Sequence, residues 1–571
     1  MKILVLSLLR IGDVIMAAPA LRGLRERYPD AQIHLLINSQ FVGIGSLLPY
    51  IDRIVPFERE KLQRGLGDVN VPLFESYERL EILLDSLNAE KYDWTINLTH
   101  NRLSARLMSL IDAKIKTGLC FDAQGRVNFG SNWFYYLNQQ VDSEGTEVFH
   151  FSDVFRFALD LDWDRDGATN DVLIESARGR AEADEVLREL NSQSIIAVQP
   201  LTSDEKKNWG IHNFSSVIEL LAKRYPQTTF VVIGAPYERE RLQPFVDELE
   251  LKKIKARLAI LSLEGAFSLL KSSRMLLTGD TSIKHLACAA GTRVLEICVG
   301  SSDPYRTGAY RHGSVIVRSR EACAPCPHSI VCYRETHACA ERIPAEAVAL
   351  IAGEVYEGRM FQLRAIAEEY VEQIEILRVE ARVSGYWAAY SVLEPLTEES
   401  VARWIELTCR KLWFTGGIEI KADGVSRIGT ETLRLFRLLK TIHPKTSVIE
   451  WRHLFSDMER HLQIVEGRIN SFKVGLEYLK GCYEDPRRMR EFVRGLISLR
   501  ERIRHSPILR SFKEGLDSVI EDDVSPAFTR FRRIINLIME IDRRSQIHLR
   551  LLRGLSGQFS ISEGKRGMEK S

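Results

Sequence analysis

The chain has 571 residues, of which 45% are hydrophobic, so it is too long for one core and two or three globular domains are expected. Its charges nearly balance, with 78 Lys and Arg against 77 Asp and Glu, which gives no reason to expect nucleic acid as a partner. From Arg487 to the end, 19 basic residues stand against 11 acidic ones. This local excess is typical of a solvated helical face and also suits an anionic surface.

The N-terminal segment predicts a strand at residues 2–9, followed by a short loop and a helix from Val14 to Tyr28. Arg10 and Asp13 interrupt the apolar run, so we interpret it as an opening core strand and not as a secretory signal. No apolar stretch approaches the roughly 18 to 20 residues that span a bilayer. We therefore expect a cytoplasmic protein, at most peripheral to the inner membrane.

Strand and helix patterns alternate through the first third of the chain. Further strands are predicted at residues 31–38, 52–57, 92–99 and 114–119, and amphipathic helices at 74–88 and 102–111. Strands separated by helix-length segments imply right-handed crossovers and a parallel sheet. We assign residues 1–175 to an N-terminal Rossmann-like domain.

The pattern restarts after a charged helical stretch at residues 181–190. Strands are predicted at 194–201, 228–235, 257–263, 274–280 and 293–300, with helices at 213–224, 265–273 and 282–291 between them. Residues 190–350 thus form a second Rossmann-like domain. Ligands of such sheets bind at the carboxyl ends of the strands, so a cleft between the two domains is the expected site.

From about Ala347 the strand pattern largely stops, and residues 355–571 are predicted to form an all-helical domain. Apolar residues recur at steps of three and four from Trp451 to Leu479, and the spacing resumes at Phe492, Leu496, Leu499 and Ile503. Another helix is predicted from Arg530 to Leu552. Oligomerisation and contact with an anionic membrane are the candidate roles of this extension.

The loop after the first strand contains Arg10, Ile11, Gly12 and Asp13. Gly12 permits close approach of another group to the backbone. Asp13 is a candidate general base for deprotonating an acceptor hydroxyl. An Asp in the first turn of a helix is also favoured by capping alone.

Two loops at the carboxyl end of the second sheet predict a phosphate site. Lys207, in the loop after residues 194–201, supplies a positive charge that can neutralise a diphosphate leaving group. Asp280, Thr281 and Ser282 stand where a strand gives way to a helix, whose first N–H groups favour an anion. His285, one turn further, lies on the same face as Thr281.

Four of the nine cysteines gather in one short segment, at Cys323, Cys326, Cys332 and Cys339, with His328 and His337 nearby. Four thiolates can close a tetrahedral structural zinc site, and clustering at this spacing favours metal or free thiols over disulfides in a reducing compartment. They are a candidate structural metal site.

Residues 1–350 resemble glycosyltransferase family 9, the ADP-heptose:lipopolysaccharide heptosyltransferases. The resemblance rests on four segments in the expected order, residues 10–38, 97–119, 206–235 and 279–310, the last followed by the cysteines.

The resemblance implies a GT-B fold, an inverting mechanism and no catalytic metal. It implies that Asp13 is the general base, with Arg10 and Gly12 in the acceptor-side loop. It also implies a donor, a nucleotide diphosphate sugar such as ADP-heptose, and a lipopolysaccharide or other lipid-linked acceptor.

On the donor side, Lys207 matches the lysine that contacts phosphate, and Asp280, Thr281 and His285 match the donor-binding signature. The chain departs from that signature at Ser282, where the family usually has Gly, which leaves the sugar and the nucleotide open. Two alternatives remain. One is a GT-B transferase for another sugar or for a protein or capsule acceptor, and the other is a non-catalytic scaffold with a degenerate transferase core.

Overall fold

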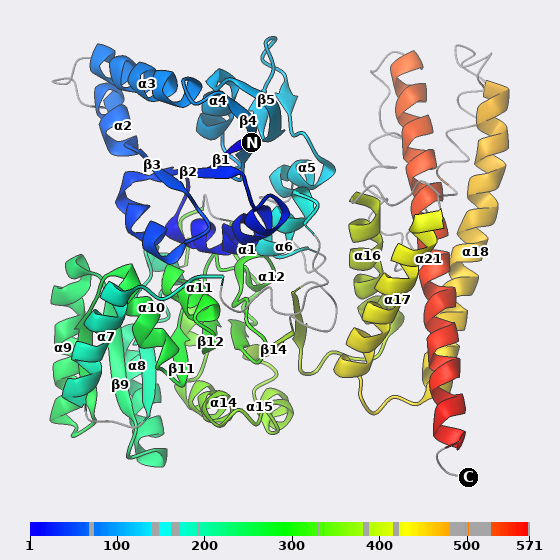
Figure 1. The fold of residues 1–571 in the computed structure, drawn as a ribbon. Coiled ribbons are helices and arrows are strands. Elements are labelled where there is room, and N and C mark those ends of the chain that lie inside the picture. The colour runs from blue at the N-terminus through cyan, green and yellow to red at the C-terminus, as the bar shows by residue number, and fades with distance from the viewer. Residues whose placement is uncertain are drawn as a thin grey trace. The chain divides into compact units, whose positions relative to one another are not determined.

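The computed structural model describes residues 1–67, 73–139, 148–161, 172–190, 194–327, 330–334, 336–380, 387–414, 422–479, 497, 499, 501 and 527–568. The chain forms two compact units, Met1–Leu393 and Glu394–Ser571. The first is an α/β unit and the second is helical (Figure 1).

The first half of the α/β unit is built on a five-stranded sheet in the order β3-β2-β1-β4-β5, with every pair parallel. This is the order expected of a Rossmann-like domain, and it confirms the predicted fold of the first half. The apolar residues Ile3 to Leu6 of the central strand are fully buried, which explains why this short run nucleates the sheet. The strands are β1 (Lys2–Ser7), β2 (Gln32–Asn38), β3 (Arg53–Phe57), β4 (Tyr92–Asn97) and β5 (Ala113–Gly118).

Helices and one small hairpin complete this first half. They are α1 (Ile11–Arg27), the 3-10 helix η1 (Ser39–Leu47), α2 (Arg59–Gly67), α3 (Leu73–Asn88), α4 (Arg102–Leu110), the hairpin β6 (Cys120–Phe121) and β7 (Val127–Asn128), α5 (Asn132–Gln139) and α6 (Phe151–Ala158). Helix α1 begins three residues before the predicted start, at Ile11 and not at Val14. Gly12 and Asp13 therefore lie in the first turn of a helix.

The second half follows α7 (Ala177–Leu190) and holds an eight-stranded sheet in the order β10-β9-β8-β11-β12-β13-β14-β15. Its first six strands are parallel and repeat the Rossmann-like order, which confirms the fold predicted for this half. They are β8 (Ile195–Gln199), β9 (Thr229–Gly234), β10 (Ala256–Ile260), β11 (Met275–Thr278), β12 (Arg293–Cys298) and β13 (Val315–Ser319).

The connections of the second half are mostly helical. They are the 3-10 helices η2 (Glu205–Lys207) and η3 (Pro236–Glu238), and the helices α8 (Ile211–Arg224), α9 (Arg239–Leu251), α10 (Leu263–Lys271), α11 (Ser282–Ala289), α12 (Pro304–Thr307), α13 (Ala338–Glu341), α14 (Ala345–Glu357) and α15 (Leu363–Glu369).

Two strands extend this sheet beyond the region where the sequence pattern predicts an all-helical domain. β14 (Ile374–Glu380) and β15 (Ala388–Ser391) add to it as antiparallel strands, so the helical unit begins at Glu394 and not at residue 355. Charged residues interrupt the apolar residues of β14 at Glu375, Arg378 and Glu380, and the strand lies next to the edge strand β15. That pattern carries a weaker apolar signal than the central strands.

The two halves meet where α1 of the first packs against α11 of the second (Figure 1). α1 also packs against α6. The N-terminus of α1 follows β1 and that of α11 follows β11, and both strands lie at the centre of their sheets. The carboxyl ends of the two central strands therefore lead into the same contact.

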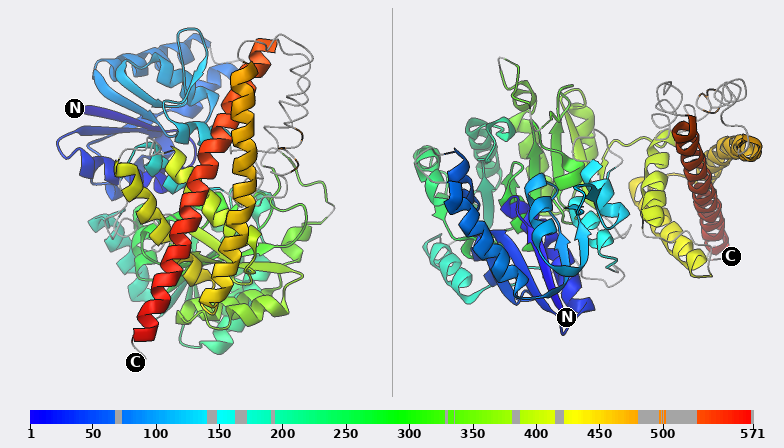
Figure 2. Two further views of the ribbon diagram at one scale, coloured as in Figure 1. Left: turned by 90° about the vertical axis from the view of Figure 1, so that its right-hand side faces the viewer. Right: turned by 90° about the horizontal axis from the view of Figure 1, so that it is seen from above.

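The helical unit contains α16 (Glu398–Phe414), α17 (Ala422–Ile442), α18 (Val448–Leu479) and α21 (Ala527–Met568), and α18 and α21 run side by side (Figure 2). The predicted apolar seam of α18 is buried at Trp451, Met458, Leu462 and Ile469, as a bundle requires. Most of the seam predicted from Phe492 to Ile503 lies outside the described residues. Within the described chain, none of the helices combines the length and the apolar character that crossing a bilayer demands.

Candidate functional site

Asp13 lies in the first turn of α1, at the end of the central strand of the first sheet. Its Oδ2 accepts a hydrogen bond of 2.9 Å from the backbone N–H of Arg10, so the capping role that the sequence left open is present. Its Oδ1 accepts no hydrogen bond from the described residues. The side chain is partly exposed, and one carboxylate oxygen is therefore available to a ligand.

The start of α11 is a ready anion site. Thr281 is the N-cap, and its hydroxyl accepts the backbone N–H of Lys284 at 3.3 Å. The backbone N–H groups of Ser282 and Ile283 find no acceptor among the described residues. Two donors and the positive end of the helix dipole thus remain for a phosphate oxygen.

Gly12 brings the two helix starts together. A Cβ built on Gly12 would lie 3.1 Å from Cδ2 of His285 and 4.0 Å from Cα of Ser282. Carbon atoms in ordinary contact are about 3.5 to 4.0 Å apart, so only a residue without a side chain fits here without displacement. The first turn of α1 and the first turn of α11 are therefore in direct contact across the two halves.

Lys207, in η2, is held by Asp280 close to the contact between the starts of α1 and α11. Its Nζ lies 2.6 Å from Oδ2 of Asp280, and both side chains are largely buried. Lys284 binds the other oxygen, Oδ1, also at 2.6 Å. Its Nζ reaches Oε1 of Glu296 at 2.6 Å as well, so the four side chains form one continuous chain of ion pairs.

The charged groups in this chain of ion pairs shift the pKa values of one another. Burial alone would raise the pKa of Asp280, but the ammonium groups of Lys284 and Lys207 hold it well below its usual range. Burial would lower the pKa of Lys284, yet Asp280 and Glu296 together raise it. Asp280 is thus a carboxylate with both oxygens occupied by cations. It cannot serve as a base, and it fixes the position of Lys207.

Asp13 belongs electrostatically to the same site. Burial raises its pKa, and the charges of Asp280 and Lys207, which lie close enough to act, push it in opposite directions. His285 is buried and its pKa is held well below the usual value by burial and by the charge of Lys284, so it is neutral. Its Nδ1 has no hydrogen-bond partner among the described residues. A neutral imidazole with a free ring nitrogen can accept or donate one hydrogen bond to a ligand.

Glu296, the last residue of the ion-pair chain, contacts a buried junction between the two halves. Oε2 of Glu296 accepts the backbone N–H of Ala309 at 2.7 Å, and the Ala309 carbonyl accepts the indole N–H of Trp387 at 2.9 Å. The backbone N–H of Trp387 in turn donates to Asp153 of α6 at 2.7 Å. The hydroxyl of Tyr310 donates to the same carboxylate at 2.7 Å.

His150 secures this junction from the first half. Its Nε2 lies 3.0 Å from the carbonyl oxygen of Gly308, and burial lowers its pKa to about 3. Because the ring stays neutral, the contact does not depend on pH in the physiological range. The sequence patterns predicted none of these junction contacts, because those that join the two halves connect residues more than 150 positions apart.

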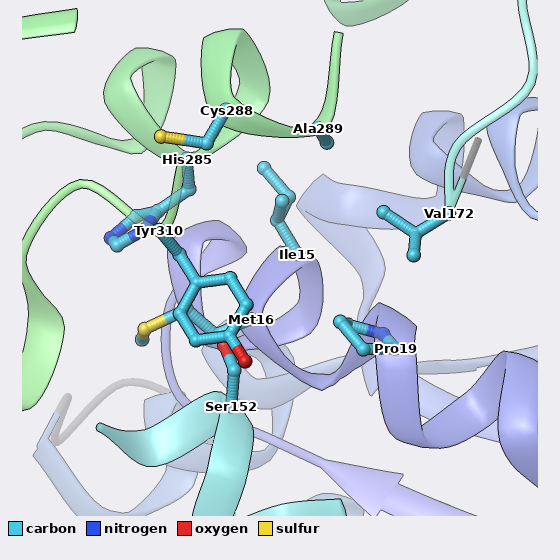
Figure 3. Close-up of a pocket in the computed structure, with 9 residues that line it drawn as sticks. All are labelled: Ile15, Met16, Pro19, Ser152, Val172, His285, Cys288, Ala289 and Tyr310. Carbon is cyan, nitrogen blue, oxygen red and sulfur yellow. The ribbon is translucent and has the colours of Figure 1, made fainter. Parts of the chain in front are cut away.

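A small apolar pocket lies between the halves beside this site (Figure 3). In Figure 3, side chains of α1 form one wall and those of α11 the other. The lining residues are Ile15, Met16, Pro19, Ser152, Val172, His285, Cys288, Ala289 and Tyr310. His285 therefore separates the pocket from the polar site at the two helix starts.

The cysteine segment lies against the lysine loop. The backbone N–H of Cys326 donates to the carbonyl of Gly300 at 3.0 Å, and the Gly300 N–H lies 3.3 Å from the sulfur of Cys339. Lys206 donates to the carbonyl of Ile330 at 3.0 Å. Cys339 is buried and Cys332 exposed, and no three of the four sulfur atoms lie within 4.8 Å of one another in the described part of the chain. His328 lies outside the described residues.

A different group of titratable side chains lies in the helical unit, where the sequence predicted no such constellation. Glu406, Cys409 and His548 place ligand atoms within 4.8 Å of one another. Glu406 is already paired with Arg410 at 2.8 Å and with Arg544, and it lies 3.0 Å from His548 Nε2. Two guanidinium groups compensate its charge, so we assign this cluster to holding α16 against α21.

The structure therefore gathers the predicted residues Gly12, Asp13, Lys207, Asp280 and His285 at one contact, with Thr281 and Ser282 at the start of α11 beside them. Arg10 donates only its backbone N–H. Sequence reasoning missed two members of the ion-pair chain, Lys284 and Glu296. Both could have been noticed in the sequence, because Lys284 lies in a mostly apolar helix and Glu296 in a mostly apolar strand. An unpaired charge in such surroundings costs free energy.

Residues 82–335 match the family model described as glycosyltransferase family 9 (heptosyltransferase). Among curated proteins, lipopolysaccharide heptosyltransferase 1 of Escherichia coli (strain K12) is 22% identical over 322 residues, which cover 56% of this chain and 94% of that protein. Lipopolysaccharide heptosyltransferase 3 of the same strain is 22% identical over 298 residues, 51% of this chain and 80% of that protein.

Two solved structures are similar to this chain at low identity. A family 9 glycosyl transferase from Veillonella parvula aligns with a TM-score of 0.48 and 19% identity, over 62% of this chain and 97% of that one. ADP-heptose lps heptosyltransferase II of E. coli aligns with a TM-score of 0.45 and 18% identity, over 62% and 99%. In every case the match leaves a large part of this chain unaligned.

Proposed function

Because this chain carries a glycosyltransferase family 9 domain and is a glycosyltransferase, we propose that it transfers a heptose from ADP-heptose to a lipopolysaccharide-type acceptor with inversion at the anomeric carbon. The observation that supports the site of transfer is the contact of the α1 and α11 starts at Gly12. It puts a carboxylate from one half next to a lysine and free N–H donors from the other.

On the acceptor side, Asp13 is the general base. Its Oδ1 accepts no hydrogen bond from the part of the chain that the structure describes, and the raised pKa of Asp13 makes the ionised carboxylate a stronger base than an ordinary aspartate. The carboxylate removes the proton of an acceptor hydroxyl as that oxygen attacks the anomeric carbon. Arg10 and Gly12 shape the same loop.

On the donor side, the departing diphosphate gains negative charge as its bond to the sugar breaks. Among the described residues, Lys207 gives one of its three N–H donors to Asp280 and the N–H groups of Ser282 and Ile283 find no acceptor. Together they stabilise that charge where it develops. A single in-line displacement then requires neither a covalent intermediate nor a metal ion.

Thr281 and His285 complete the donor side. Thr281 caps α11 and fixes the direction of its free N–H groups. Neutral His285, with Nδ1 unpaired, is suited to a hydroxyl or phosphate oxygen of the donor. Ser282 brings a hydroxyl where a glycine is usual in the family, and it distinguishes this site from the usual one.

The acceptor and setting follow from the same proposal. With a lipid-linked acceptor, the transfer takes place at the cytoplasmic face of the inner membrane. The basic residues toward the end of the helical unit can bind an anionic leaflet there. Oligomerisation through the helical unit is the other role that we propose for it. The cysteine segment packs against the Lys206 loop, but in the described part of the chain its sulfur atoms do not come together as a four-thiolate metal site requires, so a structural zinc there stays a prediction from the sequence.

The test is to incubate the purified full-length protein with a panel of nucleotide diphosphate sugars and a deacylated lipopolysaccharide core acceptor, and to measure release of nucleotide diphosphate. Release from ADP-heptose that requires the acceptor supports the proposal. Release from a different donor, or with a protein or capsule acceptor, would replace the heptose assignment. No release from any donor would favour a scaffold with a degenerate core.

A further inference from the structure

Lys284 is a lysine of the proposed donor site that lies on the buried side of Asp280. Its side chain is completely buried, as is that of Glu296 to within 1%. Burying a charge pair in the centre of a sheet costs desolvation free energy, and such a pair is weak support for stability. The pair therefore calls for a role beyond folding.

The role follows from what Asp280 does to Lys207. A carboxylate 2.6 Å from a lysine ammonium cancels most of that ammonium's field at longer range. A lysine paired with Asp280 alone would face the diphosphate as a nearly neutral dipole. The second ammonium, that of Lys284, lies 2.6 Å from the other oxygen of Asp280 and compensates the carboxylate from behind.

Glu296 sets the position of the second ammonium. It holds Lys284 with Oε1, and its own Oε2 is fixed by the backbone N–H of Ala309. The thiol of Cys298 donates to the same Oε1 at 3.4 Å. Lys284 is thus pulled between two carboxylates and cannot turn toward the cleft.

We propose that Lys284 is a positioning residue for phosphate binding: held in place by Glu296, it neutralises Asp280 from its buried side, so that Lys207 presents its positive charge to the donor diphosphate. This inference rests on the proposed function, because it assumes that a diphosphate binds at Lys207. The pair acts through Asp280 and does not touch the substrate.

The charge of the site, and not only its shape, then controls affinity for a nucleotide diphosphate. Lys284→Met makes the group more negative by one charge, and at an effective dielectric of about 20 one added charge near the site weakens binding of a diphosphate by roughly tenfold or more. Glu296→Gln makes the group more positive by one charge at nearly the same volume, and its amide oxygen can still accept from Lys284. Its affinity is expected to equal or exceed that of the wild type.

The experiment measures binding of ADP, with UDP and GDP in parallel, to the full-length protein by titration calorimetry, together with the melting temperature of each variant. The variants are Lys284→Met, Glu296→Gln and the double variant, which restores the wild-type net charge. Lys411→Met is the matched control, because Lys411 is also a buried lysine paired with a glutamate, Glu431 at 2.9 Å, but in the helical unit.

The expected result is weakened binding for Lys284→Met, unchanged or tighter binding for Glu296→Gln, and recovery in the double variant, with Lys411→Met like the wild type. A structural role would weaken binding in both single variants, and that outcome overturns the inference, as does wild-type affinity of Lys284→Met. If Lys284→Met does not fold, a Glu296→Gln variant that binds more weakly than the wild type overturns it alone. A wild type that binds none of the three nucleotides removes the proposed function as well.

Discussion

Replacing Gly12 with alanine tests the contact between the two helix starts. The new methyl group would lie 3.1 Å from Cδ2 and 3.6 Å from Nε2 of His285, and 4.0 Å from the Ser282 backbone. The backbone contact is of ordinary length, so the methyl group conflicts with the imidazole alone. The shortfall against a normal carbon contact is about 0.4 to 0.9 Å.

The expected effect divides between stability and activity. Overpacking costs on the order of 1 kcal/mol at the low end, and alanine in a helix gains up to about 1 kcal/mol over glycine, so the melting temperature should hardly change. A displacement of several tenths of an ångström between Asp13 and His285 does alter the reacting geometry. Since a misplacement of about 1 Å can cost 100-fold in rate, we expect kcat to fall by roughly threefold to thirtyfold.

The assay is steady-state nucleotide release beside thermal unfolding followed by circular dichroism. Gly43→Ala is the matched control, because a Cβ at Gly43 meets nothing within 4 Å, and it should leave kcat unchanged. Wild-type kcat for Gly12→Ala would refute the idea that transfer takes place at this contact. A large drop in melting temperature would instead mean that the contact is rigid packing.

Three further predictions follow from the site. Lys207→Ala removes a charge-assisted hydrogen bond and should raise the dissociation constant for ADP roughly tenfold to a hundredfold, whereas an unaltered constant would contradict its role. Because the pKa of Asp13 is raised, its ionised form costs stability and the acid limb of kcat/KM should lie at a higher pH than for an ordinary aspartate. Asp13→Asn should therefore raise the melting temperature at pH 7, with a gain that fades as the pH falls through the folded-state pKa and both proteins become neutral at this position. Elemental analysis of the full-length protein tests the cysteine segment: zinc that is lost in a Cys326→Ser variant would assign a structural metal site there, and a metal-free protein would exclude one.

Sequence patterns predicted the two Rossmann-like sheets well, because their central strands are continuous apolar runs such as Ile3 to Leu6. The same patterns placed the loops with Asp13, Lys207 and Asp280 at the site, because a parallel sheet brings the loops after its strands to one edge. They failed at β14, whose mixed polar and apolar residues reflect a strand near the sheet's edge.

Contacts between distant segments left no periodic signal. The junction formed by His150, Asp153, Tyr310 and Trp387 depends on how the two halves pack, and spacing along the chain does not record that. Lys284 and Glu296 were visible in principle, as charges in apolar surroundings, but only the structure pairs them. Helix α1 begins earlier than predicted because the Asp13 carboxylate accepts the backbone N–H of Arg10 and so caps the first turn.

The most direct test of the proposed mechanism is to compare Asp13→Asn with the wild type in two measurements on the same preparation: transfer from ADP-heptose and binding of ADP. A general base on the acceptor side predicts that transfer falls by about 100-fold to 10,000-fold while the dissociation constant for ADP stays nearly the same. Undiminished transfer by Asp13→Asn would contradict the assignment of Asp13 as the base.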